Sequence, residues 1–375
     1  MSGDLTELHD ELRAVAREVL AAARRRGADG EPPPLDWQTL TASGWLGLEV
    51  PEALEGAGAT LAEVAVVLHE MGRAPLRSGY LGSAVLGVGA LNLLEPTGRR
   101  DDLLGRIASG AVRVAVGLPT GDDVVGPVAP CYRLEKDGRR LRLRGRAAFV
   151  PDATDAACLL LLARDPASTL VVVAAQPTDA GLRVAEQRVL DLTRNLGEIA
   201  AEGAEVAAGA VWRFAADPEA SARRLMDRAA LAIACDSLGL AEAMMEATVA
   251  YAGVRHQFGR PIGSFQAVQH ACADMLVQVM VSRELVGTAV ELLGGEEPGS
   301  GRAVSMAKSH ACAMAVDVVG KAMQLHGGIG YTWESGVHAY LKRAVLNRSL
   351  FGSPTAHRKR LGQRYVGGVS VSSED

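Results

Sequence analysis

The chain has 375 residues, of which 48 % are apolar, 22 % are charged and only 4 % are aromatic. This composition is typical of a globular protein with a sizeable core, and at about 150 residues per domain the length favours two or three domains. It excludes an intrinsically disordered chain and predicts closely packed helices with small residues where they cross. The net charge of −5 excludes a chain-wide attraction to nucleic acid or to an anionic membrane, but it is compatible with a local basic groove for a phosphorylated ligand.

Residues 1–112 carry the period of α-helices. Apolar side chains recur every three or four positions between residues 5 and 20 and again between residues 61 and 71. Three consecutive prolines at 32–34 end the first of these stripes, because proline lacks an amide hydrogen for the helical hydrogen bond. We predict an N-terminal helical domain over 1–112.

The period changes to that of β-strands between residues 113 and 217. Apolar and charged residues alternate at 141–144, and short apolar runs occupy 158–162 and 170–173, with turn pairs such as Asp137-Gly138 between them. Strands this close together leave no room for crossover helices, so we predict a central antiparallel sheet or small barrel rather than a Rossmann unit.

The helical period returns after Pro218. Three apolar stripes at 231–249, 268–293 and 306–323 are joined by short loops, which predicts an antiparallel helical bundle over 218–366. The polar tail 367–375 is predicted to be disordered. The predicted fold class is therefore α+β, with an N-terminal helical domain, a central antiparallel β domain and a C-terminal four-helix bundle.

Several features predict a cytoplasmic protein. The five cysteines include no C-x-x-C pair, which is typical of reduced thiols, and residues 1–18 have no apolar stretch of the secretory type. The longest apolar run, at 156–163, is far below the ~18 residues that a membrane span requires. The histidines lack metal-ligand spacing, so no metal site is expected.

Two segments combine residues that suit a phosphorylated ligand. The first, at 255–266, contains Arg-x-x-Phe-Gly followed by Phe-Gln, and the second, at 324–331, reads Gln-Leu-His-Gly-Gly-Ile-Gly-Tyr. Glycines let backbone amides approach a bulky anion, and an arginine beside them suits a pyrophosphate. The same residues are also explained by an arginine exposed to solvent and a glycine that caps the end of a helix. The residues alone leave both interpretations open.

The paired motifs resemble those of the acyl-CoA dehydrogenase family. The segments Gly-Trp-Leu-Gly-Leu at 44–48 and Gly-Arg-Ala-Ala-Phe-Val-Pro-Asp-Ala at 145–153 resemble the same family, so the resemblance covers nearly the whole chain. It implies α,β-dehydrogenation of an acyl-CoA thioester by FAD bound at a subunit interface, with a glutamate as base and a separate electron-transfer acceptor.

The resemblance implies a cofactor site made of six residues. Arg255 corresponds to the residue that contacts the pyrophosphate, and Phe258 to the residue that packs on the adenosine. Gln266, Gln324, Gly327 and Gly328 complete the site, which serves the FAD of a neighbouring subunit.

The chain departs from the family pattern at the catalytic base. Phe351 and Ala229 occupy the two positions where family members carry the glutamate, and neither side chain accepts a proton. We interpret Asp227 as a solvated carboxylate at a helix start, and Glu334 as an ion-pair partner of Arg343 or Lys342. The segment Leu-Pro-Thr-Gly-Asp-Asp at 118–123 also matches the family's flavin-contacting loop poorly.

These departures predict the base-less subunit of an α2β2 heterotetramer, similar to actinobacterial acyl-CoA dehydrogenases that act on bulky thioesters such as steroid side chains. Its partner would be a homologous acyl-CoA dehydrogenase subunit. The alternatives are a self-sufficient homo-oligomeric dehydrogenase with an unrecognised base, a flavin oxidase or monooxygenase on the same fold, and a flavin-free stabilising subunit. The sequence leaves the acyl chain, the electron acceptor and the identity of the partner open.

Overall fold

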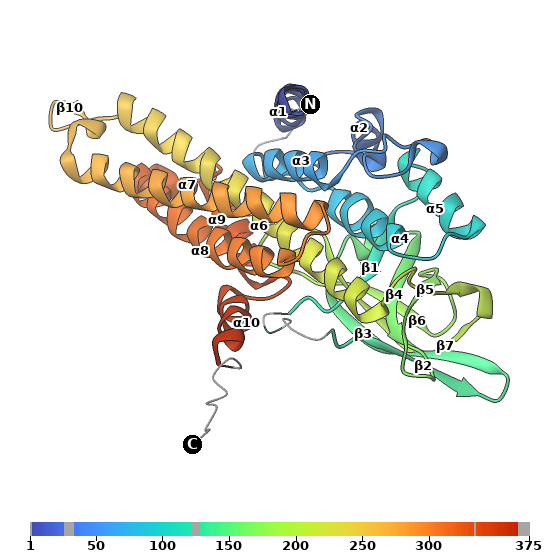
Figure 1. Cartoon of the computed structure of the whole chain (residues 1–375). Coiled ribbons are helices and arrows are strands. Elements are labelled where there is room, and N and C mark those ends of the chain that lie inside the picture. The colour runs from blue at the N-terminus through green and yellow to red at the C-terminus, as the bar shows by residue number, and fades with distance from the viewer. Residues whose placement is uncertain (1, 26–33, 122, 124–127, 334, 367–375) are drawn as a thin grey trace, which may run out of the picture.

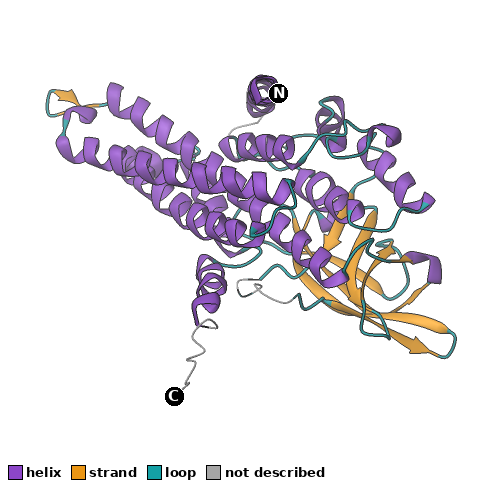
Figure 2. Ribbon diagram, viewed as in Figure 1, coloured by secondary structure: helices purple, strands orange, loops and turns teal. Residues whose placement is uncertain are grey.

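A computed structural model describes residues 2–25, 34–121, 123, 128–333 and 335–366 (Figure 1). The predicted order of helices, sheet and helical bundle is confirmed, with the sheet at one end of the molecule and the long helices extending away from it (Figure 2). The tail that we predicted to be disordered lies outside the described residues. None of the described helices is both long and apolar enough to cross a membrane.

Five α-helices lie in the described N-terminal part of the chain. Thr60 and Glu63 begin the third of them with a reciprocal capping box, in which each side chain bonds a backbone amide at the helix start. The helices are α1 (Ser2–Arg25), α2 (Trp37–Ala42), α3 (Leu61–Arg73), α4 (Val88–Asn92) and α5 (Gly98–Ala108), with a π-helical stretch at Leu81–Gly87 before α4.

The sheet is mixed, whereas the sequence predicted an antiparallel one. Its order is β6-β7-β3-β2-β4-β5-β8, and β1 also pairs with β4. Both β1 and β2 run parallel to β4. The β2–β3 hairpin reverses the chain once and the connection from β3 to β4 reverses it again, so β4 has the same direction as β2. The strands are β1 (Val114–Gly117), β2 (Tyr132–Asp137), β3 (Arg140–Pro151), β4 (Cys158–Arg164), β5 (Leu170–Ala175), β6 (Leu182–Glu186), β7 (Leu196–Val206) and β8 (Val211–Trp212).

The C-terminal bundle is organised around one long helix, α6. Asp217 caps its first turn and Pro218 occupies its first position, where proline is tolerated. The bundle contains α6 (Pro218–Val254), α7 (Gln266–Gly294), α8 (Ser300–His326), α9 (Val337–Ser349) and α10 (Pro354–Val366). The hairpin of β9 (His256–Gln257) and β10 (Arg260–Pro261) joins α6 to α7 at the end far from the large sheet (Figure 1).

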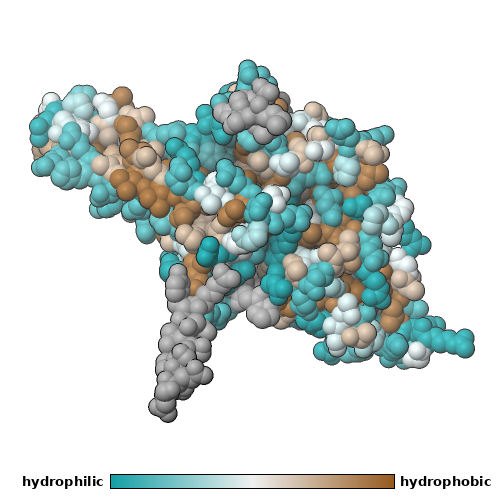
Figure 3. Space-filling model, in the orientation of Figure 1, coloured by the Kyte–Doolittle hydropathy of each residue, from teal (hydrophilic) through white to brown (hydrophobic). Residues whose placement is uncertain are grey.

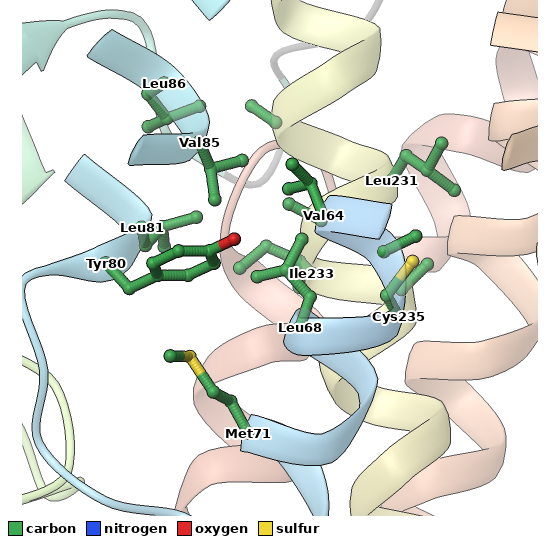
Figure 4. Close-up of a cluster of buried hydrophobic side chains, with 14 of the residues drawn as sticks. Val64, Leu68, Met71, Tyr80, Leu81, Val85, Leu86, Leu231, Ile233 and Cys235 are labelled. Atoms are coloured by element: carbon green, nitrogen blue, oxygen red, sulfur yellow. The ribbon is translucent and has the colours of Figure 1, made fainter. Parts of the chain in front are cut away.

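The main core lies where α3 and the π-helical stretch meet α6 (Figure 4). Glycines make this crossing close, as the sequence predicted. A Cβ atom on Gly72 would lie 2.0 Å from the carbonyl oxygen of Asp236, and one on Gly239 would lie 1.9 Å from that of His69. A second core packs against the other side of the sheet and includes Tyr132 and Leu161.

Candidate functional site

The first predicted segment forms the hairpin at the end of the bundle. Phe258 and Gly259 occupy its turn with φ angles of +52° and +78°, and Gln257 pairs with Arg260 across it. Two residues with positive φ are typical of the tight type I′ hairpin turn. A phenylalanine in this region costs of order 1–3 kcal/mol, and the Phe258 side chain is nevertheless 91 % exposed. Such strain at an exposed aromatic residue keeps Phe258 as a candidate functional residue.

The second segment follows the C-terminal end of α8. Gly327 has a φ angle of +63°, which favours glycine, and its amide donates to the Gln324 carbonyl. A Cβ atom on Gly327 or Gly328 would meet nothing in this chain within 4 Å. The backbone at these two glycines is therefore open to a ligand or to another subunit.

A ring stack brings the two segments together. The Tyr251 ring in the last turn of α6 lies 4.5 Å from the His326 ring at the end of α8, with 17° between their planes. The Tyr251 hydroxyl also donates to the His326 carbonyl oxygen at 3.5 Å. Sequence reasoning missed this pair, although Tyr251 precedes Arg255 by one helical turn and His326 directly precedes Gly327.

All six predicted site residues are exposed. Within the described part of the chain, no hydrogen bond or ion pair involves the side chains of Arg255, Gln266 or Gln324. The guanidinium of Arg260, in the same segment, lies 4.1 Å from the centre of the Phe265 ring. We define the cradle as the six predicted site residues Arg255, Phe258, Gln266, Gln324, Gly327 and Gly328.

The chemistry of the cradle fits the adenosine diphosphate half of FAD. A guanidinium is a donor that binds phosphate oxygens, the open space at the two glycines lets a phosphate group approach the backbone closely, and carboxamides donate to or accept from the adjoining groups. The exposed phenyl ring of Phe258 offers a face on which a purine can pack. No cluster of metal-ligating side chains occurs among the described residues.

The two positions expected for a base lie inside the protein. Phe351 is 1 % exposed, and its amide donates to the Thr120 carbonyl at 2.9 Å. Burial lowers the pKa of His357 to about 4, so its neutral ring donates from Nε2 to the Phe351 carbonyl at 3.0 Å. Ala229 is fully buried in α6. Thr120, in the poorly matching loop, thus holds Phe351.

The prediction that Asp227 is a solvated carboxylate at a helix start is wrong. Since α6 begins at Pro218, Asp227 lies in its third turn, where it is buried. Its Oδ1 accepts from Arg360 Nη1 at 2.6 Å. Burial raises the pKa of Asp227 despite this ion pair. The carboxylate is therefore held in an internal ion pair.

Arg343, one of the two partners expected for Glu334, is buried against Asp236, with Nε 3.1 Å from Oδ2. Lys342, the other expected partner, lies 4.9 Å from the centre of the Trp333 ring. Glu334 itself lies outside the described residues.

Comparison with known proteins agrees with the fold and the motifs. Residues 2–111 match the acyl-CoA dehydrogenase N-terminal domain, and residues 220–366 match the acyl-CoA dehydrogenase C-terminal domain. Acyl-CoA dehydrogenase IpdE2 of Mycobacterium tuberculosis is 30 % identical over 326 residues, covering 87 % of this chain and 85 % of that protein. IpdE2 of Mycolicibacterium smegmatis is also 30 % identical, covering 94 % of this chain and 98 % of that protein.

Two solved structures share the whole fold. The Tcur3481–Tcur3483 steroid ACAD is 29 % identical, with a TM-score of 0.83 and coverage of 98 % of this chain and 99 % of that one. The ChsE4–ChsE5 complex of Mycobacterium tuberculosis is 25 % identical, also with a TM-score of 0.83 and coverage of 96 % and 97 %. The chain belongs to the acyl-CoA dehydrogenase family of flavoprotein oxidoreductases.

Proposed function

We propose that this chain is the base-less subunit of an α2β2 acyl-CoA dehydrogenase that oxidises a bulky, steroid-type acyl-CoA thioester. In this assembly a homologous subunit supplies the glutamate base and the pocket for the flavin ring. This chain supplies the cradle for the pyrophosphate and adenosine of the same FAD. Electrons leave through a separate electron-transfer acceptor.

The observation that carries the proposal is the contrast between the two halves of the site. Phe351 and Ala229 replace the base with side chains that are apolar and buried. The cradle residues at the far end of the bundle are exposed. A chain that kept the cradle but lost the base can serve a flavin whose ring lies in another subunit.

The cradle residues have separate roles in this proposal. Arg255 binds pyrophosphate oxygens, and Phe258 packs on the adenosine. Gly327 and Gly328 allow their backbone to approach the ligand, while Gln266 and Gln324 bond its polar edges. When bound, FAD supplies the acceptor for the hydride that leaves the β-carbon of the thioester.

Two observations support a partner subunit. Both solved relatives described above are named as pairs of different proteins, and one is named a steroid ACAD. The outward face of α7 also carries Leu276, Val277, Met280 and Val281 as exposed side chains, while its inner face packs in the bundle. Apolar residues gather on the bundle arm in Figure 3. A helix that is apolar on both faces is typically buried in its full assembly.

The test compares the chain purified alone with the chain co-expressed with a glutamate-bearing homologue. We expect a colourless or insoluble chain alone. The co-expressed complex should be yellow, and anaerobic addition of the cognate acyl-CoA should bleach it. A chain that is yellow alone and bleached by an acyl-CoA would overturn the proposal in favour of a self-sufficient dehydrogenase.

Variants of the complex test the cradle directly. Arg255→Ala should lower the FAD content of the purified complex, whereas Arg139→Ala, in the exposed β2–β3 turn, is the matched control and should not. Equal FAD content in both variants would indicate a stabilising subunit without a cofactor role. Rapid reoxidation of the reduced complex by oxygen, with formation of peroxide, would indicate an oxidase.

A further inference from the structure

The two halves of the cradle lie on the ends of different helices. One half follows α6 in the exposed β9–β10 hairpin, and the other follows α8 at Gly327. Helix ends lack part of their hydrogen bonding and are the parts most prone to fraying. A ligand that bridges both halves therefore depends on whatever holds these two ends at a constant spacing.

We infer that the stacked pair Tyr251–His326 is a positioning element that holds the two halves of the cradle at the spacing that FAD requires. This inference rests on the proposed function. The rings lie 4.5 Å apart and nearly parallel. Among the described residues, this stack and the bond from the Tyr251 hydroxyl to the His326 carbonyl are the ring contact and the hydrogen bond that join 251–266 to 322–333.

Both members of the pair are directly connected to cradle residues. The Arg255 amide donates to the Tyr251 carbonyl at 2.9 Å, so the position of Tyr251 sets where Arg255 leaves the helix. His326 immediately precedes Gly327, and its Nδ1 donates to the Ala322 carbonyl at 2.8 Å, which orients the imidazole. The stack therefore connects the phosphate-binding arginine to the glycine turn through one pair of rings.

A preformed spacing matters because a ligand that must order its site loses affinity. An aromatic pair contributes about 0.5–1.5 kcal/mol, which corresponds to a factor of about 2 to 12 in a dissociation constant. Tyr251→Leu and His326→Leu should each weaken FAD binding to the complex by that factor. Tyr251→Phe and His326→Phe keep a stacked ring and should bind FAD nearly as the parent does.

The experiment titrates the flavin-free complex with FAD and, separately, with FMN, and follows flavin fluorescence. FMN has the ring but lacks the adenosine half, so a positioning role for Tyr251 predicts that Tyr251→Leu weakens FAD binding and leaves FMN binding unchanged. Because the two replacements remove the same stack, the double variant Tyr251→Leu/His326→Leu should bind FAD no more weakly than either single variant.

Three results would overturn the inference. One is unchanged FAD affinity in Tyr251→Leu while Arg255→Ala weakens it, which leaves the proposed function standing. Another is an equal loss of FAD and FMN affinity, which indicates general structural damage. The third is unchanged FAD affinity in both Tyr251→Leu and Arg255→Ala, in which case the proposed cradle fails with it.

Discussion

The Arg343 guanidinium and the Asp236 carboxylate form an ion pair closed to solvent, with Arg343 Nε 3.1 Å from Asp236 Oδ2. Asn347 Nδ2 donates to the same oxygen at 2.6 Å, and Arg194 Nη2 lies 3.3 Å from Oδ1. Burial by itself would raise the pKa of Asp236. The positive charges of Arg343 and Arg194 outweigh burial, so the pKa lies below its ordinary value. The cluster joins α6 and α9 to the loop that precedes β7.

Replacing Arg343 by methionine should destabilise the protein strongly. The change leaves Asp236 charged and buried with fewer partners, and removing one partner of a buried ion pair costs about 3–5 kcal/mol. The measurement is the midpoint of urea unfolding. Arg348→Met, at an exposed position of the same helix, is the control and should change stability by less than about 0.5 kcal/mol. Equal effects of the two changes would contradict the assigned role of the cluster.

His69 should make stability depend on pH. Its Nε2 lies 2.9 Å from Glu242 and its Nδ1 lies 3.2 Å from Glu70. Burial by itself would lower the pKa of His69. The carboxylates of Glu242 and Glu70 outweigh burial, so the pKa lies above its ordinary value. A raised folded-state pKa gives stability that is complete below about pH 6.5, the unfolded value, and is lost as the pH rises through the folded value.

The test compares His69→Gln with the parent in urea at pH 5.5, 7 and 9. We expect the parent to be more stable at pH 5.5 by roughly 2 kcal/mol, the scale of a hydrogen bond to a charged group. The difference should shrink at pH 9. A difference that grows with pH would contradict a charged His69.

Asp152 should make the stability of the protein fall as the pH rises, which is opposite to the effect of an ordinary acidic residue in an ion pair. It is buried, and its Oδ2 accepts from the Gly82 amide at 2.8 Å. Burial raises the pKa of Asp152 to about 7. The folded state therefore holds a proton that the unfolded state releases near pH 4, so the protein loses stability as the pH rises from about 4 to 7.

Asp152→Asn removes this titration and keeps an acceptor for Gly82. We expect the variant to match the parent at pH 4 and to exceed its stability by several kcal/mol at pH 8, as measured by urea unfolding. Asp155→Asn, at an exposed position nearby, should lack this effect. If Asp152→Asn were less stable than the parent at pH 8, the pKa of Asp152 would not be raised in the folded protein.

Phe258→Ala should affect the cofactor without affecting the fold. Because the side chain is almost fully exposed, the free energy of unfolding should change by less than about 0.5 kcal/mol. Base stacking on an aromatic ring contributes about 1–3 kcal/mol, so FAD should bind the complex at least about 5-fold more weakly. Flavin fluorescence titration measures this change, and Phe258→Tyr should restore affinity. Unchanged affinity in Phe258→Ala would remove Phe258 from the cradle.

Much of the fold could be predicted because its signals are local. The apolar period of residues 61–71 and 306–323 depends on neighbours three and four positions away, and the structure has α3 and α8 there. The direction of strand pairing was not predictable in this way. Whether β1 lies parallel to β4 depends on where the chain returns after the β2–β3 hairpin, which no local pattern encodes. The domain boundaries at 112 and 217 stay predictions.

The same distinction between local signals and long-range contacts applies to the site. By itself the sequence determined the family and the absence of a carboxylate at 351 and 229, because these follow from residue types at known spacings, and it predicts the residues of the cradle. Only the tertiary structure decided that Tyr251 stacks on His326, that Asp227 pairs with Arg360 and that Arg343 pairs with Asp236. Each of these contacts joins residues about 75 or more positions apart. Many side chains in the sequence could form such a contact, and the packing of whole helices decides which of them come together.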